Sequence, residues 1–161
     1  MRHGPVPVAL LALMVLGVAL VAQQNRIDLV TPAAPELAAY GHHAVGVRTI
    51  PVVDRQRVDV VHTAPSGSVV RYDRPLTLEV WYPAALATGA TGGGTYRVMT
   101  RDPAIQATLH GRAVRDAAPL GGPAPFPLVI ISHGYPGNRF LLSHLAENLA
   151  SKGYVTVSID H

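Results

Sequence analysis

Residues 127–161 read PLVIISHGYPGNRFLLSHLAENLASKGYVTVSIDH, and this stretch decides the fold. It begins with the continuous apolar run Leu128–Ile131, which is typical of a central parallel strand covered on both faces. A loop rich in Gly and Pro follows. Residues 139–152 then place leucine at every fourth position from 141 to 149, joined on the apolar face by Leu142, Ala146 and Ala150, which predicts an amphipathic helix. Tyr154–Ile159 alternates apolar with small polar side chains and predicts a second strand.

The ends of this helix carry recognisable signals. Asn138 is a candidate N-cap, and Gly153 stands where a helix-terminating residue with positive φ belongs. We expect the polar side chains of the helix to face water, namely His144, Glu147, Asn148, Ser151 and Lys152. The 21 residues between Ser132 and Tyr154 are too many for a hairpin and suit a right-handed crossover, so the stretch predicts a strand–helix–strand unit with parallel strands.

The residues before this unit favour strands. Ala44–Asp54 is rich in β-branched residues, and Pro51 limits that strand to an edge or a bulge. Leu76–Tyr82 alternates and should end at Pro83. The sequence further predicts a short helix that starts at Asp102-Pro103 and ends before Gly111.

The predicted fold class is therefore α/β: antiparallel N-terminal strands followed by the first βαβ crossover of a mostly parallel sheet. We divide the chain into a leader (1–22), a linker (23–38) and an N-terminal part of a larger domain (39–161). Within the last, 39–118 is a β-rich lead-in and 119–161 holds a linker and the crossover.

The leader has a short basic end followed by 17 apolar residues from Val6 to Ala22. This pattern indicates a secretory signal peptide, cleaved most plausibly after Ala22, or an uncleaved N-terminal membrane anchor. In either case we expect the rest of the chain to be exported, to the periplasm or outside the cell, or held at a membrane facing outward.

Composition excludes several classes of protein. With 48% apolar and 14% charged residues, the 161-residue chain is too apolar to be disordered. Its 13 basic side chains are scattered, so we expect no nucleic-acid partner. It has no cysteine, and its eight histidines lack ligand spacing, the adjacent His42 and His43 pointing apart in an extended chain, so we expect no metal site. No partner protein is inferred.

Ligands of open α/β sheets bind beyond the carboxyl ends of parallel strands, where the loop after Ile131 and the pair Asp160-His161 both lie. Glycines allow this loop to turn tightly and to point main-chain N–H groups at a ligand, as in an oxyanion hole. Pro136 has no N–H, so Tyr135 is the expected donor and Gly134 the lesser candidate.

The neighbouring residues are given supporting functions. His133 and Gly137 are expected to support the loop, the former by hydrogen bonding. Asp160 and His161 are strand-end residues to which the sequence assigns no function.

These segments together resemble an α/β-hydrolase, and more narrowly the branch of platelet-activating-factor acetylhydrolases and dienelactone hydrolases. The strongest similarity lies in Phe126–Gly134, Gly137–Arg139, Leu145–Val155 and Asp160-His161, with weaker similarity in Gly41–Thr49 and Leu78–Pro83. The resemblance implies a serine hydrolase of small-molecule or lipid carboxylic esters that forms an acyl-enzyme without a cofactor. It also implies that Tyr135 gives one oxyanion-hole hydrogen bond. Tyr135-Pro136 departs from the Gly-rich continuation of lipases, so a bulky ring is expected to narrow the acyl pocket.

The family's nucleophile lies in a Gly-x-Ser-x-Gly motif, which residues 1–161 do not contain. We expect the serine, acid and histidine downstream, which makes this chain the N-terminal part of a hydrolase that is inactive alone. The serines present, such as Ser132 and Ser143, are expected to be structural. The alternative is a short exported binding or structural module that reuses a hydrolase βαβ unit.

Overall fold

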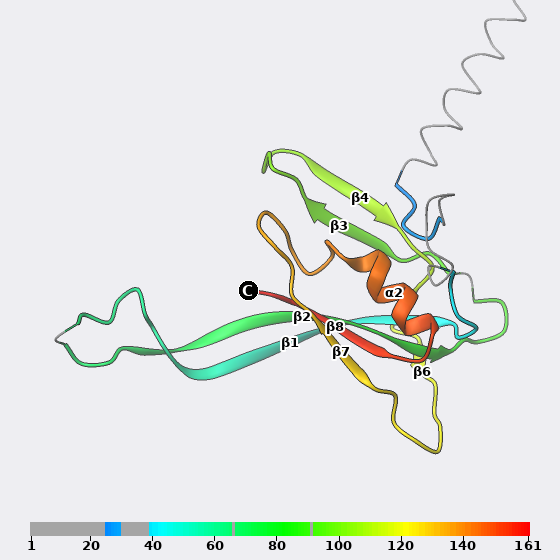
Figure 1. The fold of residues 1–161 in the computed structure, drawn as a ribbon, viewed down its shortest axis with the longest axis horizontal. Coiled ribbons are helices and arrows are strands. Elements are labelled where there is room, and N and C mark those ends of the chain that lie inside the picture. The colour runs from blue at the N-terminus through cyan, green and yellow to red at the C-terminus, as the bar shows by residue number, and fades with distance from the viewer. Residues whose placement is uncertain (1–24, 30–38, 66, 91) are drawn as a thin grey trace, which may run out of the picture.

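The computed structural model describes residues 25–29, 39–65, 67–90 and 92–161. They form a six-stranded mixed sheet in the order β5-β1-β2-β8-β7, with β6 paired to β2, and a separate two-stranded hairpin, β3–β4 (Figure 1). The strands are β1 (Val45–Val58), β2 (Arg71–Ala85), β3 (Thr95–Met99), β4 (Gln106–His110), β5 (Val114–Arg115), β6 (Ala118–Pro119), β7 (Leu128–Ile131) and β8 (Val155–Asp160). Helix α2 (Ser143–Ser151) lies between the hairpin and the sheet.

The predicted strand–helix–strand unit is present. β7 and β8 pair in parallel, from Leu128 opposite Val155 to Ile131 opposite Ser158, and α2 connects them. Gly153 ends the helix with φ +94°, as its position predicted. Asn138 does not cap α2, because its side-chain oxygen accepts the N–H of Phe140 in a turn that precedes the helix.

β7 differs from the expected central strand. Within the described residues it pairs only with β8, at the end of the sheet. Leu128 and Ile130 are 59% and 63% exposed, while Ile131 on the opposite face is buried. An apolar run shows that a strand is suited to burial, but it does not show how many neighbours the strand has.

The two N-terminal strands are longer than predicted. β1 and β2 pair antiparallel from Val45–Pro83 to Val58–Arg71, with a bulge between Asp54 and Arg57. Pro83 does not end β2, which continues to Ala85. Pro51 lies on an edge, as predicted, because β5 pairs with β1 only at Gly46 and Val47.

The predicted helix after Asp102 is wrong. Asp102 accepts the N–H of Ala104 and forms only a turn, after which residues 106–110 form β4. Ala107 and Leu109 alternate toward the core, beside Tyr96 and Val98 of β3, so a period of two decides this segment. The Asp102-Pro103 pair does mark a turn, but this turn joins the two strands β3 and β4.

The buried face of the helix agrees only in part with the prediction. Glu147 and Ser151, expected in water, are 0% and 1% exposed, whereas Leu145 is 41% exposed. Ala146 and Ala150, expected on the apolar face, are fully buried. These small side chains let α2 approach the sheet closely, and the leucine stripe is turned partly outward.

The buried carboxylate of Glu147 explains why a charged residue lies on the inner face. Its oxygens accept hydrogen bonds from the Tyr96 hydroxyl (2.5 Å), the Tyr40 hydroxyl (3.2 Å) and the backbone N–H groups of Arg112 (2.8 Å) and Ala113 (3.1 Å). Four donors compensate the carboxylate for the water it loses. Burial, and then the nearby Glu147 charge, raise the pKa of Tyr96, so that hydroxyl stays a donor.

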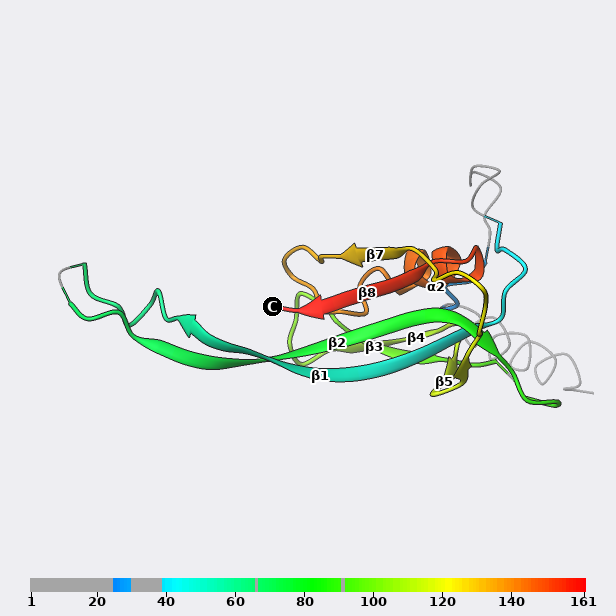
Figure 2. The same cartoon turned by 90° about the horizontal axis from the view of Figure 1, so that it is seen from below.

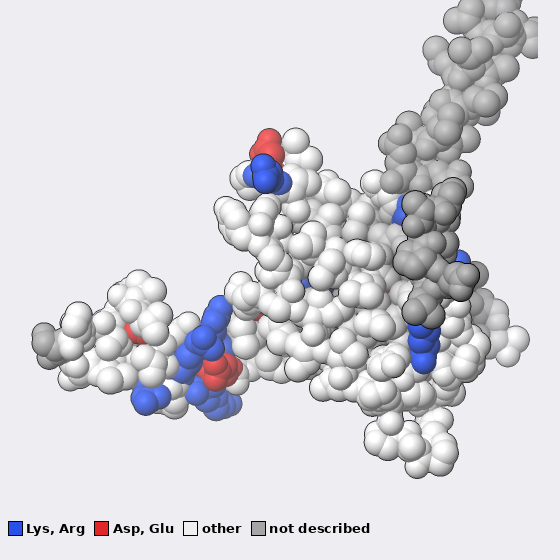
Figure 3. Space-filling model, in the orientation of Figure 1, with Lys and Arg blue, Asp and Glu red and all other residues white. Residues whose placement is uncertain are grey.

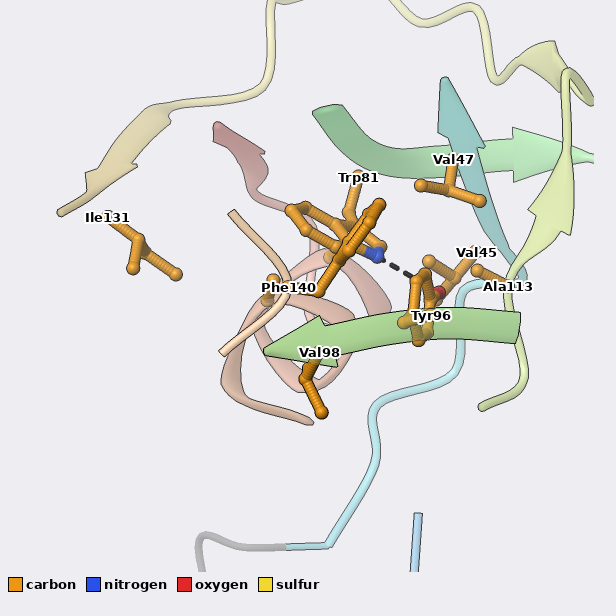
Figure 4. Close-up of a cluster of buried hydrophobic side chains, with 10 residues drawn as sticks. Val45, Val47, Trp81, Tyr96, Val98, Ala113, Ile131 and Phe140 are labelled. Carbon is orange, nitrogen blue, oxygen red and sulfur yellow. Dashed lines mark hydrogen bonds between the residues drawn. The ribbon is translucent and has the colours of Figure 1, made fainter. Parts of the chain in front are cut away.

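The apolar core surrounds this network. Tyr96 accepts a hydrogen bond from the Trp81 indole (3.1 Å), and both rings are fully buried (Figure 4). Val45 and Val47 of β1 and Phe140 before α2 complete the same cluster. The core therefore joins the sheet, the helix and the β3–β4 hairpin.

Part of the expected linker packs against the β4 end of this core. The N–H of Ile27 donates to the His110 carbonyl (3.0 Å), and the N–H of His110 donates to the Asn25 carbonyl (2.9 Å). Asp28 is buried and pairs with Arg26 (2.6 Å) and Arg112 (2.7 Å). The predicted leader, 1–22, lies outside the described residues. Among the described helices, none is long and apolar enough to cross a membrane.

Gly111 allows a direct test of the Glu147 network. A Cβ at this position would lie 2.1 Å from Glu147 Oε1, so Gly111→Ala should lower the free energy of unfolding by about 3 kcal/mol. Urea denaturation measures this. Gly121→Ala is the control, because a Cβ there meets nothing within 4 Å, and equal stability of the two variants would contradict the packing described.

Asp28 predicts an acid-dependent loss of stability. The Arg26 hydrogen bond, and then the one from Arg112, lower the pKa of Asp28 to about 2, against an opposing effect of burial. Since the folded pKa is below the unfolded value of about 3.9, the stabilisation is complete above pH 5 and is lost as the pH falls toward 2.

At pH 7, Asp28→Asn should therefore be about 1–2 kcal/mol less stable than the wild type, and the gap should close by pH 2. Denaturation at a series of pH values measures it. Asp102→Asn is the control, because Asp102 has no ion-pair partner among the described residues. A gap that does not change with pH would exclude this explanation.

Candidate functional site

A cleft of about 440 Å³ opens where β7 and β8 end. The two strands run in parallel, so the loop after Ile131 and the residues after Ile159 meet at one edge of the sheet. The β3–β4 hairpin forms the opposite wall. The lining residues are Arg97, Val98, Met99, Gln106, His133, Gly137, Asn138, Arg139, Asp160 and His161.

The cleft brings together four of the six site residues expected from the sequence, namely His133, Gly137, Asp160 and His161. Gly134 and Tyr135 lie in the same loop but do not line the cleft. The Tyr135 ring is 101% exposed, so within the described residues it narrows no pocket.

The two loop glycines have different structural requirements. A Cβ at Gly137 would lie 2.6 Å from the Gly134 carbonyl oxygen and 2.9 Å from Leu141 Cδ2, so a side chain there would open the loop. A Cβ at Gly134 would meet nothing within 4 Å. Gly137 is thus required for the tight turn, whereas Gly134 leaves space open beside the loop.

The main-chain donors of this loop are unused. Within the part of the chain that the structure describes, neither the Gly134 nor the Tyr135 N–H donates a hydrogen bond. The loop itself is held by Asn138, whose side chain donates to the Arg97 carbonyl (3.0 Å) and ties the loop to β3. Both N–H groups are therefore chemically able to bind an anion or a carbonyl oxygen.

His133 lies at the base of the loop. Its Nδ1 is 3.1 Å from the Gly134 carbonyl oxygen, which favours the tautomer protonated at Nδ1. Its Nε2 is buried and pairs with no group among the described residues. The ring faces that of His161, with centroids 4.5 Å apart and planes tilted by 31°. Nε2 can accept a hydrogen bond from a group that enters beside it.

Three charged side chains anchor the end of the loop: Asp160, to which the sequence assigned no function, and Arg139 and Glu79, which were not expected at the site. Asp160 accepts the backbone N–H of Arg139 (2.6 Å) and pairs with its guanidinium. Arg139 Nε also lies 3.4 Å from Glu79, which is fully buried in β2. The first residue after the loop is therefore bound to both β8 and β2.

Glu79 has two further partners. It pairs with Arg115 and accepts a hydrogen bond from Thr49 of β1 (2.7 Å). One signal in the sequence could have revealed it: Glu79 precedes Trp81 by two positions in a strand, so both side chains lie on the same face. A carboxylate beside a core tryptophan requires a cation, which Arg115 and Arg139 provide.

The histidines outside the cleft that the structure describes do not form a ligand set. Contrary to the expectation that they point apart, His42 and His43 stack at a ring-centroid distance of 4.0 Å, because this segment is not an extended strand. Among the described residues no group of three or more potential metal ligands comes together.

The Asp160–Arg139 contact gives a testable prediction. In Asp160→Asn the amide removes the charge opposite the guanidinium, so the free energy of unfolding should fall by about 1–2 kcal/mol and the amides of 133–139 should exchange faster. Hydrogen exchange measured by mass spectrometry reports both. The control is Asp116→Asn, since Asp116 forms an exposed pair with Arg48 at 3.4 Å. Unchanged exchange in the loop would show that Asp160 does not hold it.

Comparisons with known proteins agree with the resemblance expected from the sequence. Residues 72–161 match the family model of platelet-activating factor acetylhydrolase, isoform II. A ferulic acid esterase from Streptomyces cinnamoneus has a similar structure, with a TM-score of 0.54 and 26% sequence identity over 85% of this chain. The match covers 36% of the esterase, so this chain spans about a third of its length. No curated protein matches. The chain belongs to the family of platelet-activating factor acetylhydrolase, isoform II.

Proposed function

We propose that this chain forms the oxyanion-binding part of an exported serine hydrolase that acts on carboxylic esters. The observation that carries the proposal is the loop 133–138 at the carboxyl end of β7, with the Gly134 and Tyr135 N–H groups unused. The family and the esterase neighbour support an ester substrate. We further propose a partial α/β-hydrolase fold, of which the β7–α2–β8 unit is the first crossover.

The proposed chemistry assigns a task to each part of the loop. When a nucleophile attacks the ester carbonyl, negative charge develops on the carbonyl oxygen, and the Tyr135 N–H, assisted by Gly134, stabilises it. His133 and Gly137 support the turn that carries these donors. Arg139, held by Asp160 and Glu79, fixes the point at which the loop joins the segment leading to α2.

The nucleophile is proposed to come from sequence outside these residues, since 1–161 hold no Gly-x-Ser-x-Gly. The exposed Leu128 and Ile130 of β7 support this, because further strands and helices of a larger domain would cover them. The apolar run from Val6 to Ala22 supports export, by a cleaved signal or an uncleaved anchor.

Two experiments test the proposal. Residues 1–161 should not react with a fluorophosphonate probe, and labelling of a serine such as Ser132 would contradict the assignment. A protein extended to include the downstream reading frame should be labelled and should hydrolyse p-nitrophenyl acetate, and a downstream frame without Gly-x-Ser-x-Gly would refute it.

In that longer protein, Tyr135→Pro removes the proposed donor and should lower kcat by roughly 100- to 1000-fold. Tyr135→Ala keeps the N–H and serves as the control. Equal kcat values for the two variants would show that this N–H does not bind the oxyanion.

A further inference from the structure

The β1–β2 ribbon extends well beyond the sheet as an arm, here the described residues 54–65 and 67–74. The last β2–β8 pair joins Thr77 to Asp160, so the part of β2 before Thr77 has no neighbour on that side among the described residues. Figures 1 and 2 show the arm leaving the body at the end where β8 stops, which is also the end that carries the cleft. From Thr77 to Val70 it reaches about 23 Å at the usual rise of a strand.

Exposed valines flank the turn at the distal end of the arm. Val60 and Val61 are 81% and 82% exposed, and Val69 and Val70 lie on the returning chain, where the Val70 carbonyl accepts the N–H of Asp59 (2.8 Å). The one acid at this end is engaged locally: Asp59 accepts the N–H groups of Val61 and His62 and pairs with the His62 ring at 2.7 Å. The tip thus presents valines to water without an apolar partner in the described structure.

Arginines surround the arm immediately behind this tip. Figure 3 shows basic side chains, with acidic ones among them, gathered on the part of the arm nearer the body, with a mostly uncharged end beyond them. The arginines are Arg55, Arg57, Arg71 and Arg74. Arg55 pairs with Asp73 and Arg57 with Asp54, but within the described residues Arg71 and Arg74 contact no carboxylate.

We propose that the arm docks on an anionic lipid surface, with the valine tip in the interfacial region and the arginines at the lipid phosphates. The valines lie nearer the end of the arm than the guanidinium groups, and this order matches that of acyl chains and phosphates in a membrane leaflet. Guanidinium groups bind phosphate through two hydrogen bonds and keep their charge at the interface.

A second copy of the chain fits the arm less well. Pairing of strand edges is the ordinary way for two β-ribbons to associate, but the strands of the arm carry four arginines, and Pro51 and Pro75 lie at its base, all of which oppose it. The most exposed apolar side chains lie near the end of the ribbon, where Val60 and Val61 are 81% and 82% exposed, against 50% for Val53 and 37% for Val58 nearer the body. Since the arm and the cleft share one end of the sheet, lipid docking turns the cleft end toward the membrane.

The chain has no cysteine, so a single label can report on the arm in the full protein. We would label Val61→Cys with the environment-sensitive dye NBD and add vesicles of 30% phosphatidylglycerol in phosphatidylcholine. The emission should shift to the blue and be quenched by nitroxide-labelled lipid. Ile105→Cys, at an exposed position before β4, is the control and should not respond. Both proteins carry the same apolar leader, so the difference reports on the arm.

The charge requirement is tested with Arg74→Gln in the Val61→Cys background. The lipid concentration that gives half of the response should rise roughly fivefold, the value expected for one arginine at an anionic surface. Arg101→Gln removes the same charge from the β3–β4 hairpin and should leave this lipid concentration unchanged. Added salt should act in the same direction as Arg74→Gln.

Two outcomes would overturn the proposal. A label at position 61 that stays in water when vesicles are present excludes lipid docking. A blue shift that appears without lipid and grows with protein concentration shows that a second copy covers the tip. Neither outcome depends on ester hydrolysis, so the experiment leaves the proposed function to its own tests.

Discussion

The carboxylate of Glu147 is the interaction on which the rest of the structure depends. It lies on α2 and receives donors from three separate segments: Tyr40 before β1, Tyr96 of β3, and the turn at Arg112 and Ala113. The backbone hydrogen bonds of the six-stranded sheet do not connect these segments to the helix. A buried carboxylate with four hydrogen-bond donors is stable, whereas burying one without donors costs free energy. Displacing any of these segments would remove a donor, so each segment stabilises the position of the others.

A second buried acid also connects separate segments, at the end of the sheet that carries the cleft. Glu79 of β2 pairs with Arg115 of β5 and with Arg139 after the loop, and Arg139 also binds Asp160 at the end of β8. The loop is therefore anchored on the residue that follows it. The N–H groups of Gly134 and Tyr135 remain available because the loop's conformation is maintained elsewhere, by Asn138 and by the requirement for glycine at position 137.

Sequence patterns predicted the helices and strands of this fold better than they predicted which residues each of them packs against. The apolar run before His133, the helix before Gly153 and the alternation after Tyr154 are local signals, and each produced the expected element. The prediction of a helix in residues 102–110 was wrong because an Asp-Pro pair starts a turn as readily as a helix. Only the pairing of β4 with β3 decides between them.

The sequence by itself determined the parallel strand–helix–strand unit and the place of the candidate site, because backbone periodicity and the ends of strands are properties of consecutive residues. Tertiary structure alone decided which stripe of α2 is buried. Ala146 and Ala150 of the predicted apolar face are buried, but their buried neighbours are Ser143 and Glu147 rather than Leu145, because this side of the helix allows close approach together with donors for a carboxylate. For the same reason the sequence did not indicate Glu79 and Arg139 as anchors of the loop and assigned no function to Asp160: these three residues are distant in sequence and meet only in the folded chain.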